Sequence, residues 1–183
     1  AVNPTSGPAQ QITLWVGETS ADQVSDVDTI QTIDVSALVD SQYDICFFDN
    51  LLTNAFFDSK SVIVGQRVFI GGTFASNVFT PQMISLRFQG VYGTLTQGSV
   101  NVVNGNAGTF QLQNNALIGY SLGGAPLTVA TGNVTLFVNT TGLSALQSGG
   151  AMPLVAGGLL FVDPLNSTPV MAAAVVADPP LTQ

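Results

Sequence analysis

Residues 99–113 of this chain, SVNVVNGNAGTFQLQ, place two runs of strand-forming residues on either side of a short glycine-rich segment. Valine, threonine and phenylalanine favour extended backbone because their side chains pack well on a pleated surface. Asn104-Gly105 supplies the positive φ angles that a tight turn between antiparallel strands requires. The stretch therefore predicts a β-hairpin and sets the expectation for the rest of the chain.

Short runs of the same kind recur along the sequence, and glycine, proline or asparagine separates each run from the next. No segment keeps a 3.6-residue apolar period, so we expect helix only as single turns at residues 51–57 and 143–147. The chain is predicted to be all-β, mostly antiparallel and with little helix. The predicted strands are Gln11–Gly17, Thr29–Val35, Tyr43–Phe48, Val62–Ile70, Gln82–Phe88, Ser99–Val103, Thr109–Gln113, Leu127–Ala130, Val134–Val138, Leu154–Val162 and Val170–Val176.

An internal repeat divides the chain near its middle. Val64–Leu86 and Ala156–Val175 each combine a glycine-led strand, a turn and a proline-led strand. The repeat predicts two small β-barrel or sandwich-like units in tandem, at residues 1–89 and 90–183. The first unit begins with an extended arm of about residues 1–16 and is acidic, because nine of the eleven acids lie between Glu18 and Asp58. The second unit is poor in charge.

The charge pattern excludes several classes of protein. The chain has no Asp, Glu, Lys or Arg from Phe88 to Val162, no His, and a net charge of −8 with three basic residues. Binding to nucleic acid rests on Lys and Arg, so it is excluded, and no apolar run is long enough for a membrane-spanning helix. A folded surface without charge indicates packing against a partner, most simply further copies of the chain. The near absence of lysine suits an extracellular or cell-surface protein.

The second unit carries the pattern Gly90-Val91-Tyr92-Gly93, Gly108-Thr109-Phe110-Gln111-Leu112, Thr135-Leu136-Phe137, Leu143-Ser144-Ala145-Leu146 and Ala172–Val176. This pattern resembles a family of bacterial secreted or lipoprotein domains of unknown function, which are small OB-like β-barrels often found in tandem. In the first unit only Gly65–Gly71 matches. The resemblance implies a small-barrel fold and an envelope or extracellular location, and it implies no catalytic residues.

The arm leads into a candidate assembly strand. Ile12, Leu14 and Val16 alternate on one face of Gln11–Gly17, with Trp15 on the other. Such a strand either adds to the sheet edge of a neighbouring copy, which is β-augmentation, or closes its own barrel. Ile12, Leu14, Trp15 and Val16 are therefore the candidate residues for strand exchange.

The residues needed for most catalysis are missing. Without His, the chain has no Ser-His or Cys-His nucleophile pair and no typical zinc site. Asp44 and Asp49 lie five positions apart, so a regular strand would point them to opposite faces and away from a shared substrate. Cys46 has acids nearby and apolar neighbours, which is typical of a buried thiol and not of a reactive one. We expect neither enzymatic activity nor an organic cofactor.

The sequence leaves two alternatives for calcium binding and two for glycosylation. Asp22, Asp26 and Asp28 form either a solvated acidic loop or a calcium site, although the EF-hand spacing is absent. Asn133, Asn139 and Asn166 each begin an N-x-S/T sequence, which is either a chance match or a glycan acceptor. Trp15, Tyr92 and Tyr120 are candidate platforms for a sugar, whereas the eleven phenylalanines are assigned to the core.

Two functions follow from these observations. The first is a non-catalytic extracellular structural subunit that polymerises into a filament, pilus-like fibre or surface layer, through strand addition and uncharged packing faces. The alternative is a monomeric secreted or cell-surface module that binds carbohydrate, calcium or a protein partner. Open or head-to-tail association would favour the first function, and an exposed binding groove would favour the second.

Overall fold

A computed structural model of the chain describes residues 2–3, 7–16, 29–45, 57–104, 106–118, 121–122, 125–130, 132–139, 143–147, 150–162 and 168–177. The fold is mostly β, which confirms the predicted all-β class. Residue contacts divide the chain into two compact units. The first unit contains the described residues within 2–45, 57–64 and 68–86, and the second contains those within 65–67 and 87–177.

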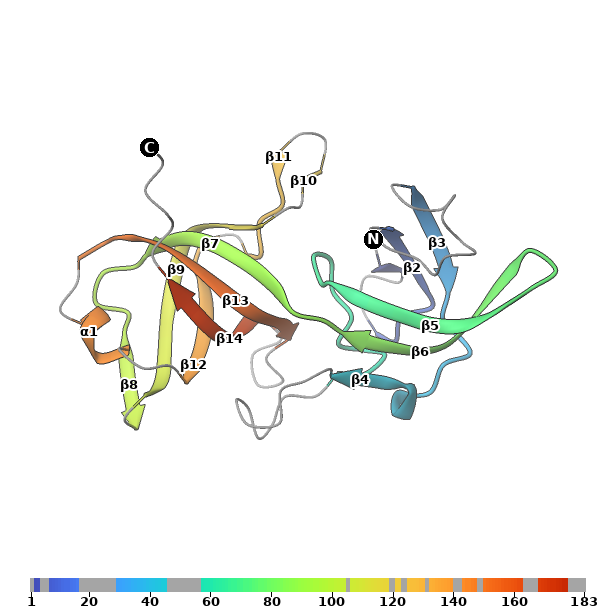
Figure 1. The fold of residues 1–183 in the computed structure, drawn as a ribbon, viewed down its shortest axis with the longest axis horizontal. Helices are drawn as coiled ribbons and strands as arrows, with labels where there is room; N and C mark the ends of the chain where they lie inside the picture. The colour runs from blue at the N-terminus through green and yellow to red at the C-terminus, as the bar shows by residue number, and fades with distance from the viewer. Residues whose placement is uncertain are drawn as a thin grey trace. The chain divides into compact units, whose positions relative to one another are not determined.

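The second unit is a closed five-stranded barrel (Figure 1). The strands pair in the order β12-β14-β13-β7-β9, and β9 pairs with β12 to close the ring. Every pairing in the ring is antiparallel except that of β12 with β14. The ring strands are β7 (Gln89–Leu95), β9 (Ala107–Leu117), β12 (Val134–Asn139), β13 (Pro153–Val162) and β14 (Pro169–Ala177).

Smaller elements complete the second unit. Strand β8 (Asn101–Asn104) pairs with β9 in the hairpin that the sequence predicts, and β10 (Ser121–Leu122) pairs with β11 (Ala125–Pro126). Helix α1 (Leu143–Gln147) confirms the helical turn predicted there. The predicted turn at residues 51–57 lies outside the described residues except for Phe57.

The barrel core follows from the two-residue period of its strands. On β9, Phe110 and Leu112 are buried and the residues between and beside them are half-buried, as expected when alternate side chains point inward. Burial of a large apolar side chain stabilises a fold by about 1.5–3 kcal/mol. The largest fully buried side chains of this core are Phe110, Leu95, Leu112, Leu117, Leu136, Leu143, Leu154, Leu159, Leu160 and Met171.

The first unit consists of two three-stranded sheets. Strands β1 (Val2–Asn3), β2 (Gln11–Trp15) and β3 (Ile30–Asp34) form an antiparallel sheet in that order. The other sheet has the order β4-β6-β5, and a 3₁₀ turn at Asp40–Gln42 leads into it. Its strands are β4 (Tyr43–Ile45), β5 (Val68–Ala75) and β6 (Val78–Leu86). The buried apolar residues are Ala9, Ile12, Val35, Leu38, Tyr43, Phe57, Val62, Ile84 and Leu86.

The two units share one local topology. In each, the register of a hairpin shifts at a Gly-Gly pair, Gly71/Gly72 in β5 and Gly157/Gly158 in β13, where the partner strand has one extra residue. In each, a preceding strand, β4 or β12, lies parallel to the second hairpin strand. In the second unit two further pairings, β9 with β12 and β7 with β13, close the ring. Within the described part of the first unit, the two sheets share no strand pairing.

This topology corrects details of the predicted repeat and strands. Gly71-Gly72 lies inside β5 and does not lead it, and Pro81 lies inside β6 opposite Gly72. The predicted strand Val62–Ile70 is therefore wrong in extent, since β5 runs from Val68 to Ala75. Strand β7 was not predicted because its glycines are typical of a boundary. The glycine at position 93 lies where neighbouring backbone leaves no room for a side chain, because a Cβ there would lie 2.9 Å from the Gln113 carbonyl oxygen.

Candidate functional site

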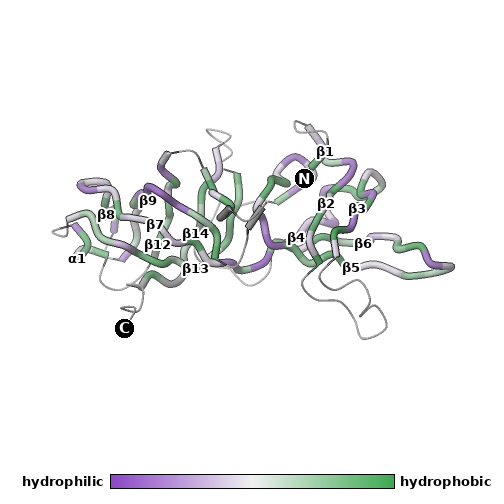
Figure 2. Tube along the Cα trace, turned by 90° about the horizontal axis from the view of Figure 1, so that it is seen from above, coloured by the Kyte–Doolittle hydropathy of each residue, from purple (hydrophilic) through white to green (hydrophobic). Residues whose placement is uncertain are grey.

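The β5–β6 hairpin is free of charge over residues 68–86, and its distal half is exposed. Its turn contains Ser76 and Asn77 with φ of 51° and 62°, as a two-residue hairpin turn that follows the strand twist requires. Figure 2 shows green, hydrophobic stretches on both strands of this hairpin, separated by pale and purple ones. A hairpin with both faces in water is marginally stable alone, so the exposed apolar residues need an explanation beyond local stability.

The hairpin presents apolar side chains on both of its faces. Phe74 pairs with Phe79, and a Cβ on Gly72 would lie 2.9 Å from the Phe79 ring, so this pair lies on the Gly72 face of β5. Gly71 points to the other face, where a Cβ would lie 2.9 Å from Met83 Cγ and 3.2 Å from Phe69 Cε1. We call Phe74 and Phe79, at the distal end of the hairpin, the hairpin face.

The exposure of two phenylalanines corrects their assignment to the core. Phe69 and Phe74 are 49% and 45% exposed, and Met83 is also exposed. Nearer the base of the same hairpin, Ile84 and Leu86 are buried in the core of the first unit. Sequence reasoning missed this surface because strand register and the bulge decide which side chains share a face.

The barrel has its own exposed apolar surface. Gly90 of β7 and Gly157 of β13 are cross-strand partners, and each has a large side chain above it. A Cβ on Gly157 would lie 2.6 Å from the Phe88 ring, and one on Gly90 would lie 2.8 Å from Ile118 Cδ1. Tyr92 follows two positions after Gly90 and therefore points to the same side. We call Phe88, Tyr92 and Ile118 the barrel patch.

The barrel patch lies on a unit whose described residues carry only two charges, those of Arg67 and Arg87. Its three side chains are between 41% and 44% exposed. From Phe88 to Ala177, the described residues include no Asp, Glu, Lys or Arg. The polar residues at the surface of the barrel are amides and hydroxyls such as Asn101, Asn114 and Thr128, which are exposed. Depletion of charge together with aromatic residues is typical of the centre of a protein–protein interface.

The predicted assembly strand lies inside its own sheet. Strand β2 pairs with β3 along its whole length and with β1 at Gln11 and Ile12. Ile12 is buried and Leu14 and Val16 are half-buried, whereas Trp15 is 53% exposed. Trp15 pairs with Ile30, which is more exposed still. Donation of β2 to another copy would therefore require an exchange of these pairings.

The predicted calcium ligands Asp22, Asp26 and Asp28 lie outside the described residues. Within the described ranges, no three acidic, His or Cys side chains lie close enough to hold a metal. The acids there stabilise loops. Asp34 Oδ1 accepts hydrogen bonds from the Ser36 hydroxyl (2.6 Å) and N–H (2.9 Å), which hold the pKa of Asp34 below its ordinary value.

Asp40 anchors a distant loop in the same way. Its Oδ1 accepts hydrogen bonds from the Ser59 hydroxyl at 2.7 Å and from the Ser59 N–H at 3.2 Å, and both lower the pKa of Asp40. The nearby Tyr43 phenol is buried against Phe57, with ring centroids 5.6 Å apart. Burial raises the pKa of Tyr43, and the charges of Asp40 and Asp58 raise it further.

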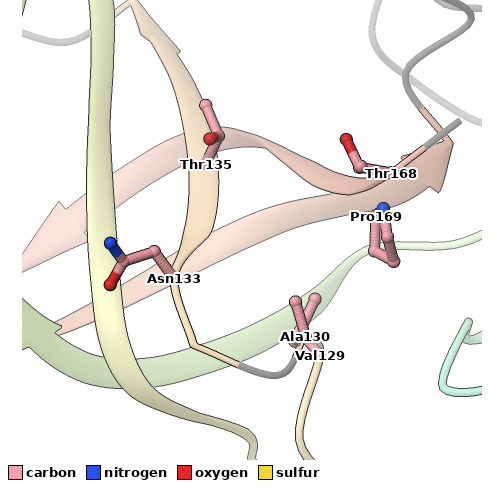
Figure 3. A pocket seen from close by; sticks show the side chains of 6 residues that line it. All are labelled: Val129, Ala130, Asn133, Thr135, Thr168 and Pro169. Atoms are coloured by element: carbon pink, nitrogen blue, oxygen red, sulfur yellow. The ribbon is translucent and has the colours of Figure 1, made fainter. Parts of the chain in front are cut away.

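A hollow of about 530 Å³ opens at the barrel (Figure 3). Its lining has no charged side chain and offers one amide and two hydroxyl groups to a ligand. Asn115, only 2% exposed, holds one wall, because its Oδ1 accepts hydrogen bonds from the N–H groups of Val129 and Ala130. Sequence reasoning did not identify this hollow. The lining residues are Val129, Ala130, Asn133, Thr135, Thr168 and Pro169.

The predicted glycan acceptors are spread over the second unit. Asn133 is exposed at the hollow, where its Nδ2 donates to Gln111 Oε1 at 3.1 Å and its Oδ1 accepts from Thr96 Oγ1 at 3.2 Å. Asn139 is the last residue of β12, and Asn166 lies outside the described residues. Of the candidate sugar platforms, Trp15 is in the first unit, Tyr92 is in the second, and Tyr120 is not among the described residues.

Comparisons with protein-family models, with curated proteins and with solved structures found no match to this chain. None of the helices in the described part of the chain is long and apolar enough to cross a membrane.

Proposed function

We propose that this protein is a non-catalytic structural subunit that associates with copies of itself outside the cell or at its surface. The observation that carries the proposal is the exposed apolar surface of an uncharged hairpin, formed by the hairpin face and, on the opposite side, by Phe69 and Met83. Contiguous exposed apolar surface on a folded protein marks an interaction site. Aromatic and methionine side chains are also those enriched in protein–protein interfaces.

The edge strands of the first unit support the same function. In the described part, the edge strands are β1 and β3 of one sheet and β4 and β5 of the other. Edge strands are commonly protected from pairing by charged residues such as lysine, by proline or by bulges. Strand β5 has no charge and no proline over residues 68–75, and the extra residue of the hairpin bulge lies in β6. Strand addition at this edge would extend the sheet into a neighbouring copy, alongside packing of the hairpin face.

One pair of variants on the same strand tests the proposal. Phe74→Glu places a charge on the hairpin face, whereas Thr73→Glu places the same charge on the opposite face one residue away. We expect sedimentation velocity to show concentration-dependent association for the native protein and for Thr73→Glu, and its loss for Phe74→Glu. Association of Phe74→Glu at native strength would reject the hairpin face as the contact.

A second candidate function is a binding module for an uncharged ligand such as a carbohydrate. The hollow favours it, because its polar lining consists of Asn133, Thr135 and Thr168. Sugar hydroxyls exchange hydrogen bonds with amides and hydroxyls of this kind. Titration with neutral oligosaccharides, followed by calorimetry on the native protein and on Asn133→Ala, tests this function. Heat of binding that Asn133→Ala abolishes would support it.

We also propose that the protein binds calcium and carries glycans. Asp22, Asp26 and Asp28 are proposed as calcium ligands, and association measured with and without a chelator tests that role. Asn133, Asn139 and Asn166 are proposed as glycan acceptors, and the intact mass of the protein from its native source tests that modification. Neither is needed for the hairpin face to act as a contact.

A further inference from the structure

We infer that the contact is head-to-tail: the hairpin face of one copy packs on the barrel patch of the next copy. The inference rests on the proposed self-association and names its partner surface. The hairpin face belongs to the first unit and the barrel patch to the second, so the two surfaces of one contact differ. A contact between different surfaces leaves one of each free and extends into an open chain unless its rotation closes a ring.

Charge selects this pairing over contact between two first units. The described residues of the first unit include one basic residue, Lys60, and four acids: Asp34, Asp40, Asp44 and Asp58. Two hairpin faces in contact would bring together two units that are both negatively charged. Like charges brought within the screening length of about 8 Å raise the free energy of association.

The barrel unit avoids this repulsion. The only charges among its described residues are those of Arg67 and Arg87, and both are positive, so they attract an acidic first unit. From Phe88 onward the described residues carry no charge, and such a surface loses little hydration free energy when it is covered. The barrel patch is therefore better matched in charge to a hairpin on an acidic unit than a second hairpin face is.

The chemistry of the two surfaces also agrees. The hairpin face presents two phenylalanine rings, and the barrel patch presents a phenylalanine, a tyrosine and an isoleucine. Aromatic rings pack edge-to-face or offset against one another. In the barrel patch, Phe88 and Ile118 lie directly over the backbone of Gly157 and Gly90, because these two residues have no side chain to displace them.

Two variants and their mixture test the inference. Phe74→Glu disables the hairpin face and leaves the barrel patch intact, whereas Tyr92→Glu does the reverse. We expect each variant alone to associate at least about tenfold more weakly than the native protein. An equimolar mixture should form a one-to-one dimer and no larger species, because only one productive contact is left. Val103→Glu, on exposed β8 outside the barrel patch, is the control and should associate normally.

Each alternative gives a distinct result in sedimentation velocity. If Tyr92→Glu associates like the native protein, the contact does not use the barrel patch, and the head-to-tail inference fails while self-association stands. If the mixture of variants stays monomeric, the inference also fails. If the native protein is monomeric at every concentration, the proposed function itself fails. Co-flotation of that monomer with phosphatidylcholine vesicles would assign the hairpin to a membrane instead.

Discussion

At the scale of single residues, Asn115 shows how a buried polar group organises the barrel. Its amide nitrogen donates to the carbonyl oxygens of Gly132 (2.9 Å), Ala130 (3.2 Å) and Leu112 (3.4 Å). Its oxygen accepts from the N–H groups of Val129 and Ala130. One side chain thereby satisfies several backbone groups of the loop between β11 and β12. A buried polar network is stabilising when all its members are bonded in this way.

Asn115→Ala should lower the free energy of unfolding by about 3 kcal/mol, because several buried backbone groups lose their partner at once. Chemical denaturation measures the loss. Asn101→Ala is the matched control, since Asn101 is an exposed strand residue, and it should change stability by no more than about 0.5 kcal/mol. Equal stability of the two variants would contradict the role given to Asn115.

The lowered pKa of Asp40 predicts how stability depends on pH. A carboxyl whose pKa is lower in the folded state stabilises the fold above its unfolded pKa, near 3.8, and this contribution is lost as pH falls through the folded value. Asp40→Asn should therefore flatten the decline of unfolding free energy between about pH 5 and pH 2. The hydrogen bonds from Ser59 lower the pKa of Asp40. If the stability of Asp40→Asn fell with pH as steeply as that of the native protein, these bonds would not have the role given to them.

At the scale of elements, the Gly-Gly bulges fix the hairpins of both units. At Gly158 the chain of β13 approaches β14 so closely that a Cβ would overlap the Ala172 carbonyl oxygen. An added methyl group therefore has to displace backbone, and no flexible side-chain end is present to move aside. The bulge is a requirement of the barrel and not a tolerated irregularity.

Gly158→Ala should destabilise the barrel by about 3 kcal/mol or more, through overpacking against the β14 backbone. Gly150→Ala is the matched control, because a Cβ there meets nothing within 4 Å. Thermal unfolding followed by circular dichroism compares the two. The bulge would be unimportant if Gly158→Ala melted at the native temperature.

Strands that end at turn residues were predictable, and elements that depend on distant contacts were not. The pattern of Val134–Val138 predicted β12 within one residue. Leu127–Ala130 was predicted as a strand for its apolar run, but the Asn115 side chain takes the N–H groups that a strand would pair. Strand β7 was missed because the neighbours that make Gly90 and Gly93 fit are remote in sequence.

The candidate site was predictable only in its chemistry. The absence of charge predicted an uncharged contact surface, and that absence is visible in the sequence itself. Which side chains form the surface depends on strand register, because a shift of one residue exchanges the two faces of a strand. Phe74 and Ile84 lie in one hairpin, yet one is exposed and the other is buried.

At the scale of the whole molecule, one chain joins two kinds of unit. The first unit carries most of the acids and the exposed hairpin, and the second is a closed barrel whose described surface is uncharged beyond Arg87. Copies that associate hairpin to barrel would bring an acidic first unit against a barrel unit whose described charges are both positive.

The central claim is that the native protein forms an open chain of copies through its hairpin face and its barrel patch. Negative-stain electron microscopy of the native protein beside Phe74→Glu tests it most directly. The account predicts linear chains for the native protein and dispersed particles for Phe74→Glu. Dispersed particles of 18.9 kDa for the native protein at every concentration would contradict the claim.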